Sequence, residues 1–418
     1  MNLQFTFRGR TRNRDGLLRA IQRIARRDGD QIGAWKDGMR LVLCPLGYLD
    51  MTWERESGLF GQWQIKGGCD TTPAGPGFHK AVADLVTELA KRDLKDVQVD
   101  DPTGYWEDRD FQRLVREHYD PWLEGELRGV LSKLEQSPES VPLFWGEEGY
   151  LPREVPETVY TPMGRFSKGW LQERLDGGRT RELAQRIFLW PNAAKDALYH
   201  RNGAMKRMWQ DCCFAPSDRH YSDEQVNGFV LNWLEQAAKM DPSLPLPVSA
   251  YRELCIMDGR AFSVPEDAPE LEEEYVPGYH KEELLQSYET LWIPLPGVYR
   301  YEWSDDGKGN AGCIWLDEDG GGPIWRVSAY RSQDGAAEWN ADFSELRDVE
   351  TMELGDKGKA RWGWKEIPNK AEPDEPLSQL LGEVAAGDVL YVITVTFSDE
   401  QEEVYDRLRR MKIMPKAE

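Results

Sequence analysis

Two periods of apolar residues organise the first 138 positions of the chain. Apolar-rich stretches, the third and fourth of which alternate as half-buried strands do, predict strands at residues 3–8, 39–44, 48–56, 59–66 and 97–101. Two stretches between them carry apolar residues every three or four positions, which is the helical period. Their apolar faces consist of Leu17, Leu18, Ile21, Ile24 and Ala25, and of Phe78, Val82, Leu85, Val86 and Leu89. Because both helices would cover one face of the strands, we expect an α+β domain with segregated helices.

Residues 139–287 change character, with proline-rich connections between helical patterns. Ser167 and Thr180 stand where helix caps are expected, and Ser222 with Gln225 forms a capping-box pattern. We therefore predict a mainly helical domain. The acidic, proline-bearing stretch at 263–278 is predicted to be a linker.

Residues 288–418 predict a run of strands and one final helix. The strands are expected at 297–303, 312–319, 323–332, 361–367 and 388–398. Ser398 and Gln401 form a capping-box pattern before a helix whose Val404, Leu408 and Met411 would face the sheet. The chain is thus predicted to be a multidomain α+β protein: an N-terminal antiparallel sheet with helices on one face, a mainly helical middle, and a C-terminal antiparallel sheet with a terminal helix.

The final strand and helix, VLYVITVTFSDEQEEVYDRLRRMKI, and the strands before them carry a family resemblance. This segment resembles the PsbP-like α/β sandwich, also found in DcrB-type bacterial proteins. Because domains of that kind are mostly binding modules, the resemblance implies binding and carries over no site residue. The chain as a whole is similar in character to immunity proteins of bacterial toxin systems, being acidic, rich in tryptophan and built of α+β modules.

Charge and composition narrow the classes of function. Lys and Arg number 52 against 74 Asp and Glu, a net charge of −22. That surplus repels nucleic acid and favours a basic protein partner or plain solubility. The chain shows neither an apolar run of membrane-spanning length nor the pattern of a signal peptide, so we expect a cytoplasmic protein that does not bind membranes. Six cysteines without CxxC spacing suggest neither a zinc ribbon nor a disulfide framework, and no nucleotide fingerprint implies a cofactor.

The stretch KGGCDTTPAGPGFHKA, residues 66–81, carries a cysteine, an aspartate and a histidine among glycines. Cys69 could act as a nucleophile with His79 as its base, and Asp70 lies beside them. Alternatively, Thr71, Thr72 and Gly77 could bind an anion at the start of the following helix. The same residues are also the usual material of a strand-to-helix turn, and the sequence leaves these alternatives open.

Asp100 and Asp101 stand at the end of a predicted strand, close to three further carboxylates at residues 107, 108 and 110. Paired carboxylates could bind a metal or act as acid and base, but carboxylates near a helix N-terminus also stabilise the helix. Since no two histidines share the HxxxH spacing of a helical zinc site, no metal is predicted.

Trp362 and Trp364, two residues apart, should face the same side of a strand. That side is either core or an exposed contact patch, and we keep both residues as candidate binding residues.

The sequence therefore predicts a cytoplasmic bacterial protein-binding protein, an immunity or conflict-system component that holds a protein partner. The alternative is an enzyme with Cys69, Asp70, His79, Asp100 and Asp101 as its site. A second alternative is a structural scaffold, which would form constitutive oligomers.

Overall fold

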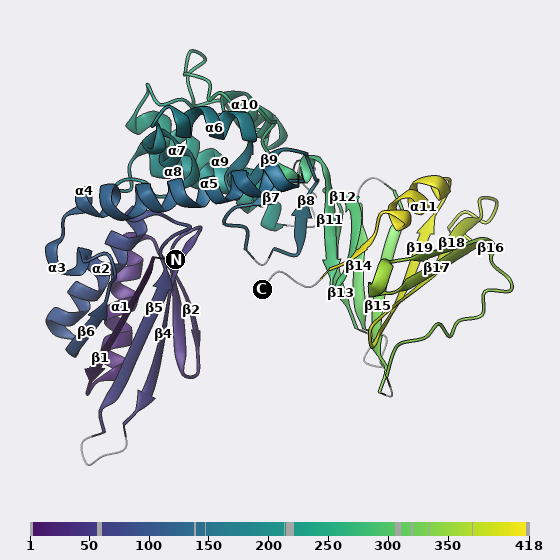
Figure 1. The fold of residues 1–418 in the computed structure, drawn as a ribbon, viewed down its shortest axis with the longest axis horizontal. Coiled ribbons are helices and arrows are strands. Elements are labelled where there is room, and N and C mark those ends of the chain that lie inside the picture. The colour runs from purple at the N-terminus through teal and green to yellow at the C-terminus, as the bar shows by residue number, and fades with distance from the viewer. Residues whose placement is uncertain are drawn as a thin grey trace. The chain divides into compact units, whose positions relative to one another are not determined.

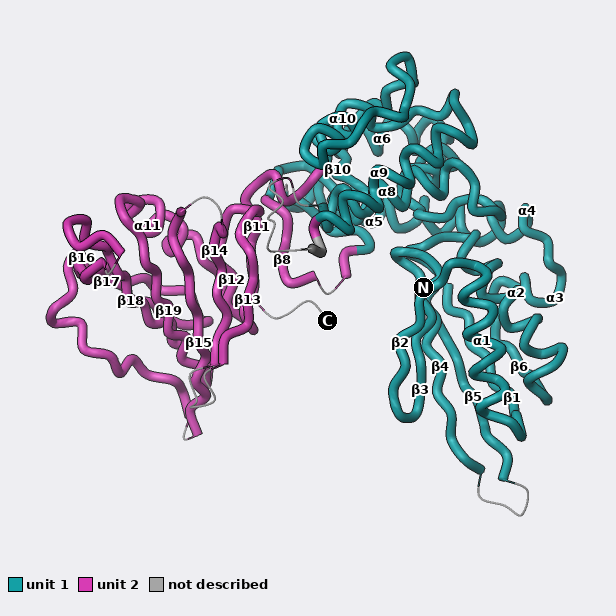
Figure 2. The backbone as a smooth tube through the Cα atoms, turned by 180° about the vertical axis from the view of Figure 1, so that it is seen from behind, with its two compact units in different colours: residues 1–144, 154–212, 224–277 teal, residues 145–153, 213–223, 278–418 magenta. Residues whose placement is uncertain are grey.

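The computed structural model describes residues 3–56, 61–137, 139–146, 148–212, 214, 221–305, 311–318, 321–333, 335–369 and 371–414. They form two compact units (Figure 2). One comprises residues 1–144, 154–212 and 224–277, and the other comprises 145–153, 213–223 and 278–418. Most of the predicted first and middle segments therefore share a unit, while the division into three domains stays a prediction.

The first unit begins with a six-stranded antiparallel sheet of order β2-β3-β4-β5-β1-β6. Its strands are β1 (Gln4–Thr11), β2 (Gln31–Trp35), β3 (Gly38–Cys44), β4 (Gly47–Arg55), β5 (Trp63–Asp70) and β6 (Lys95–Asp100). Helices α1 (Arg14–Asp28) and α2 (Pro76–Arg92) cover one face of this sheet (Figure 1). Strand β2 was not predicted, because none of its residues is fully buried and the stretch lacks an apolar pattern.

The predicted apolar faces of both helices are confirmed. In α2 all five predicted positions are buried, and in α1 all but the half-buried Leu18. Phe5 and Phe7 of β1 are buried, while Thr6 between them and Arg8 after them are exposed, which is the alternation of a sheet with one covered face.

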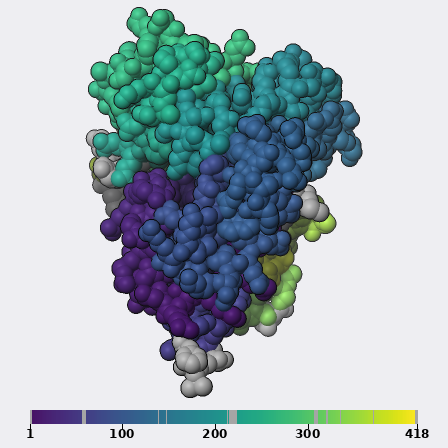
Figure 3. Space-filling view, turned by 90° about the vertical axis from the view of Figure 1, so that its left-hand side faces the viewer, coloured from purple at the N-terminus to yellow at the C-terminus, as the bar shows by residue number. Residues whose placement is uncertain are grey.

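The rest of the first unit is mainly helical, as predicted. Its helices are α3 (Tyr105–Asp108), α4 (Phe111–Leu114), the π-helical turn η1 (Val115–Tyr119), α5 (Asp120–Gln136), α6 (Lys168–Asp176), α7 (Thr180–Ile187), α8 (Ala197–Gln210), α9 (Tyr221–Met240), which begins in the second unit, and α10 (Val248–Met257). A small sheet joins β7 (Val141–Pro142), β9 (Thr158–Thr161) and β10 (Gly164–Ser167). Figure 3 shows the N-terminal residues in purple and blue beside the helical residues in teal and green.

The predicted helix caps have different outcomes. The Ser167 hydroxyl accepts the Trp170 amide proton at 3.1 Å and caps α6, as predicted. The prediction that Thr180 caps a helix is wrong, because Arg179 is the cap residue of α7 and the Thr180 hydroxyl faces Glu124 instead. The Ser222 side chain lies outside the described residues.

The acidic stretch predicted to be a linker packs instead against the helical part. Glu273 pairs with Arg186 at 2.6 Å, and the Glu274 carboxylate accepts a hydrogen bond from the Ser167 hydroxyl. The Leu271 amide donates to the Leu246 carbonyl at 2.7 Å. The prediction of a linker was therefore wrong, because composition does not reveal tertiary contacts.

The second unit contains a seven-stranded and a four-stranded antiparallel sheet. The larger has the order β13-β14-β15-β19-β18-β17-β16, with β13 (Arg300–Ser304), β14 (Gly312–Leu316), β15 (Ile324–Arg331), β16 (Arg347–Glu353), β17 (Lys359–Ile367), β18 (Leu377–Ala386) and β19 (Val389–Phe397). The smaller has the order β20-β12-β11-β8, with β8 (Tyr150–Pro152), β11 (Glu283–Tyr288), β12 (Leu291–Pro296) and β20 (Lys412–Ile413). Two short 3-10 turns are η2 (Tyr279–Lys281) and η3 (Gly355–Lys357).

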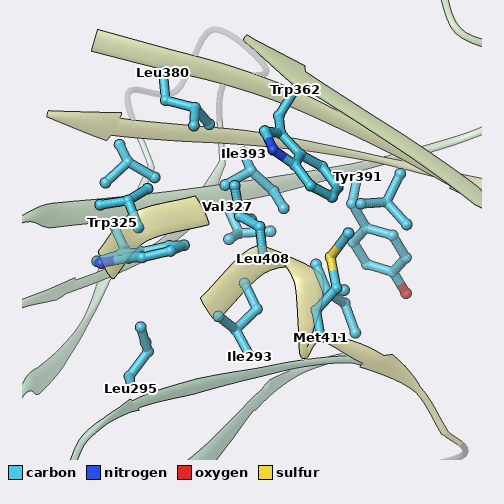
Figure 4. Close-up of a cluster of buried hydrophobic side chains, with 14 of the residues drawn as sticks. Ile293, Leu295, Trp325, Val327, Trp362, Leu380, Tyr391, Ile393, Leu408 and Met411 are labelled. Atoms are coloured by element: carbon cyan, nitrogen blue, oxygen red, sulfur yellow. The ribbon is translucent and has the colours of Figure 1, made fainter. Parts of the chain in front are cut away.

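The core of this unit lies between the larger sheet, β12 and helix α11 (Gln401–Arg409) (Figure 4). Leu408 from α11 and Met411 just after it meet Ile293 from β12 and Val327 from β15 in this core. The prediction that Ser398 caps α11 is wrong, since Glu400 is the residue directly before this helix. Antiparallel sheets at both ends and a helical middle confirm the predicted multidomain α+β arrangement.

Candidate functional site

The predicted loop ending at His79 folds into a buried hydrogen-bond network. His79 is fully buried on α2, with Nδ1 3.0 Å from the Thr71 hydroxyl and Nε2 3.3 Å from Oδ2 of Asp101. The Tyr119 hydroxyl donates to Oγ1 of Thr71 at 2.7 Å, and Thr71 donates to the Leu3 carbonyl at 2.6 Å. The network thus joins the residue before β1, the β5–α2 loop, α2, the residue after β6 and η1.

The hydrogen bonds of Thr71 and Thr103 indicate which atoms around His79 act as acceptors. Because the Thr71 hydroxyl donates its proton to the Leu3 carbonyl, its oxygen is left to accept from Nδ1 of His79. Thr103 donates to Asp101 at 2.7 Å, so both oxygens near Nε2 are acceptors. Both ring nitrogens of His79 thus face oxygen atoms that can accept a hydrogen bond.

The environment of Asp101 favours its charged form. Burial alone would raise the pKa of Asp101, but the hydrogen bond and charge of His79, with hydrogen bonds from Thr103, outweigh it and hold that pKa well below the usual range. The Trp106 amide also donates to this carboxylate at 2.8 Å. The pair therefore has the features of a structural ion pair.

Cys69 and Asp70 take other roles in this structure. Burial raises the pKa of the Cys69 thiol, which lies 3.9 Å from the Phe5 carbonyl oxygen. The Asp70 carboxylate accepts from the Thr72 amide at 2.9 Å and from its hydroxyl, and the Thr72 hydroxyl accepts from the Leu3 amide. Since other residues hold both ring nitrogens of His79, neither nitrogen is placed to act as a base for Cys69.

The start of α2 is filled by another part of the chain. The Gly77 amide donates to the Trp190 carbonyl at 2.9 Å, and the Trp190 amide donates to the Ala74 carbonyl at 2.7 Å. A Cβ on Gly77 would lie 2.1 Å from Cδ1 of Trp190, so only glycine allows this approach. Thr71 and Thr72 are buried. Of the residues predicted to bind an anion, Gly77 thus bonds to Trp190, whereas Thr71 and Thr72 bond to Leu3.

The two predicted aspartates at 100 and 101 lie in different surroundings. Asp101 is buried beside His79, whereas Asp100 is exposed and lines a hollow on the sheet face opposite the helices. The sequence brought them together as an acidic pair, but consecutive residues in extended chain point to opposite sides.

This face, which we call the open face, carries two rows of side chains across strands β4, β5, β1 and β6. One row consists of Asp50, Gly68, Thr6 and Asp100, and the other consists of Thr52, Lys66, Arg8 and Gln98. Together they line a hollow of about 700 Å³. Gly68 contributes only backbone to this lining, beside the Thr6 side chain.

Few of the open-face charges are neutralised. The Arg40 guanidinium holds Asp50 through two hydrogen bonds of 2.7 Å, and Nε of Arg8 donates to Gln98 at 2.6 Å. Within the described part of the chain, neither Arg8 nor Lys66 forms an ion pair with a carboxylate. Sequence reasoning missed this site, although the alternation of Thr6, Arg8 and Arg10 with buried residues was a signal for it.

The two candidate tryptophans share the core of the second unit. Trp362 is 1% exposed in that core, and the partly buried Trp364 packs against it and donates to the Asp348 carboxylate at 2.9 Å. The core alternative therefore describes Trp362. In the described ranges, no three His, Cys, Asp or Glu side chains gather as metal ligands, and no helix has the length and apolarity to cross a membrane.

No family model and no curated protein matches the chain. A crystal structure of a protein from Bacteroides thetaiotaomicron is similar over 31% of this chain, with 12% identity and a TM-score of 0.22. The match spans 47% of that protein, and at this score the likeness carries no argument about fold or function.

Proposed function

We propose that this chain is a protein-binding protein of the bacterial cytoplasm, an immunity or conflict-system component, and that it docks its partner on the open face. The observation that carries the proposal is the contrast between the two faces of the N-terminal sheet. Helices cover one face, whereas the other presents polar and charged side chains around a hollow. Mixed charges of this kind give a docking surface its specificity.

The state of the predicted catalytic residues supports binding over the enzyme alternative. His79 and Asp101 are closed off from solvent, and the Cys69 thiol is held in its protonated form. A nucleophile needs a base within hydrogen-bond reach, and both ring nitrogens of His79 are engaged by residues other than Cys69.

The distribution of charge supports a basic partner. Residues 1–138 carry 21 Lys and Arg against 22 Asp and Glu, whereas residues 288–418 carry 15 against 27. The acidic surplus thus belongs to residues outside 1–138, and it would attract a basic protein over long range, while the open face would supply local contacts.

The likeness of the C-terminal segment to PsbP-like domains remains part of this proposal. Strand β19 runs into α11 through the acidic turn at 398–400, which is the arrangement that prompted the resemblance. A binding module in this position agrees with a protein-binding role.

Affinity capture from native cell lysate tests the proposal. The tagged full chain is compared with Thr52→Trp, which fills the hollow without changing the charge, at low and at high salt. Gln22→Trp, which adds the same side chain on the exposed side of α1, is the matched control. We expect one stoichiometric basic partner with the wild type and the control, released by salt and lost with Thr52→Trp.

Two results would contradict the proposal. Absence of any partner at either salt concentration rejects the binding function. A partner retained fully by Thr52→Trp rejects the open face as the docking surface.

A further inference from the structure

We infer that Arg8 and Lys66 form a carboxylate-binding site at the centre of the open face. The inference rests on the proposed function and names the chemical group that the docked partner inserts into the hollow.

The first argument is the register of the strands. Arg8 and Lys66 stand directly opposite each other on β1 and β5, and like charges in that position destabilise a sheet. An acidic residue opposite Arg8 would avoid this cost, and the chain has 74 acidic residues. Because the two cations stand opposite each other despite this repulsion, their position is explained better by ligand binding than by stability.

The second argument is that the two acids lining the same hollow, Asp50 and Asp100, are not paired with these cations. Arg40 engages Asp50, and Asp100 stands opposite Thr6 in the other row. Gln98 accepts from Nε of Arg8, which orients the guanidinium and leaves its terminal nitrogens for a ligand. A guanidinium matches the two oxygens of a carboxylate, and an ammonium adds a point charge.

The third argument is space. The hollow of about 700 Å³ lies within the size range of ligand sites. Its lining beside the two cations includes the Thr6 and Thr52 side chains and the backbone of Gly68. A partner's acidic side chain therefore has room to approach both cations.

Citrate is the probe for a direct test on the purified full chain. Isothermal titration calorimetry and thermal unfolding are measured at constant ionic strength for the wild type and for Arg8→Gln/Lys66→Gln. The matched control, Arg23→Gln/Arg26→Gln, removes two exposed cations from α1. We expect citrate to bind the wild type and the control, and to bind the open-face variant at least roughly tenfold more weakly.

A second variant separates binding from folding. Lys66→Glu places an acid opposite Arg8, so it should raise the unfolding midpoint and abolish the citrate response. Absence of citrate binding to the wild type overturns the inference. Equal binding by the double variant, or a citrate response retained by Lys66→Glu, also overturns it. A response to inorganic phosphate without one to citrate rejects the carboxylate.

Competition identifies the source of the carboxylate. Citrate should release the captured partner if a side chain of that partner occupies the site, and a partner that stays bound in saturating citrate overturns this part of the inference. The proposed function is judged separately, because capture by the wild type and by Thr52→Trp does not depend on citrate.

Discussion

The imidazole of His79 and the carboxylate of Asp101 lie in contact and closed off from solvent, with Nε2 3.3 Å from Oδ2 and side chains 0% and 1% exposed. The pair links α2 to the chain after β6, and Thr71 extends it to Leu3 and Tyr119. Residues that the sequence offered as catalytic candidates thus stabilise the first unit.

Replacing Asp101 should make the free energy of unfolding depend less on pH in the acidic range. Its folded pKa lies below the ordinary value of 3.8, so its contribution is complete above about pH 5 and is lost as pH falls through the folded value. Asp101→Asn should lower the free energy of unfolding by roughly 3 kcal/mol near pH 7, since it disrupts buried contacts of the carboxylate with His79, Thr103 and the Trp106 amide. Urea unfolding from pH 7 to pH 2 should show this difference narrowing.

The adjacent Asp100 provides the control for that experiment. Asp100→Asn changes an exposed carboxylate and should alter stability by less than about 0.5 kcal/mol. Equal effects of the two substitutions would show that the buried pair is not a major contributor.

Gly77→Ala should destabilise the first unit by roughly 2 kcal/mol, because its Cβ would overlap Trp190 and the Asn192 carbonyl oxygen. Gly125, in the exposed middle of α5, has no atom within 4 Å of an added Cβ. Gly125→Ala should therefore stabilise the protein by about 0.5–1 kcal/mol. Thermal unfolding of both variants checks the opposite signs, and a stable Gly77→Ala protein would contradict the close packing.

Cys69 should resist alkylation in the folded protein, because burial raises the pKa of its thiol and a protonated thiol is a poor nucleophile. Iodoacetamide labelling near pH 7.5, resolved by peptide mass spectrometry, should modify Cys69 only after addition of denaturant. Rapid labelling of the native chain, suppressed by His79→Ala, would instead favour the enzyme alternative.

Glu383 should hold residues 337–343 on the larger sheet of the second unit. Its buried carboxylate accepts the Asn340 and Ala341 amides at 3.0 and 2.9 Å and pairs with Arg361. Glu383→Gln should cost roughly 3 kcal/mol and speed hydrogen exchange at those two amides.

The exposed pair of Glu366 and Arg347 supplies the comparison for Glu383. Glu366→Gln should cost less than about 1 kcal/mol and leave exchange at residues 340 and 341 unchanged. Unchanged exchange in Glu383→Gln would mean that other contacts hold this segment.

Strong periodic patterns made much of the fold predictable. The faces of α1 and α2 could be identified because burial follows the helical period. Strands β2 and β16 were missed because they bury almost nothing. Strand β18, LSQLLGEVAA, was missed because apolar residues follow one another in it without clear alternation.

By itself, the sequence determined the α+β class, the apolar faces of the main helices and the acidic charge, since these depend on local period and composition. Only the tertiary structure decided that Asp101 faces His79 while Asp100 faces the hollow, and that Trp190 occupies the start of α2. Strand register and long-range packing bring such partners together, and no local pattern encodes which distant residue will fill a given place.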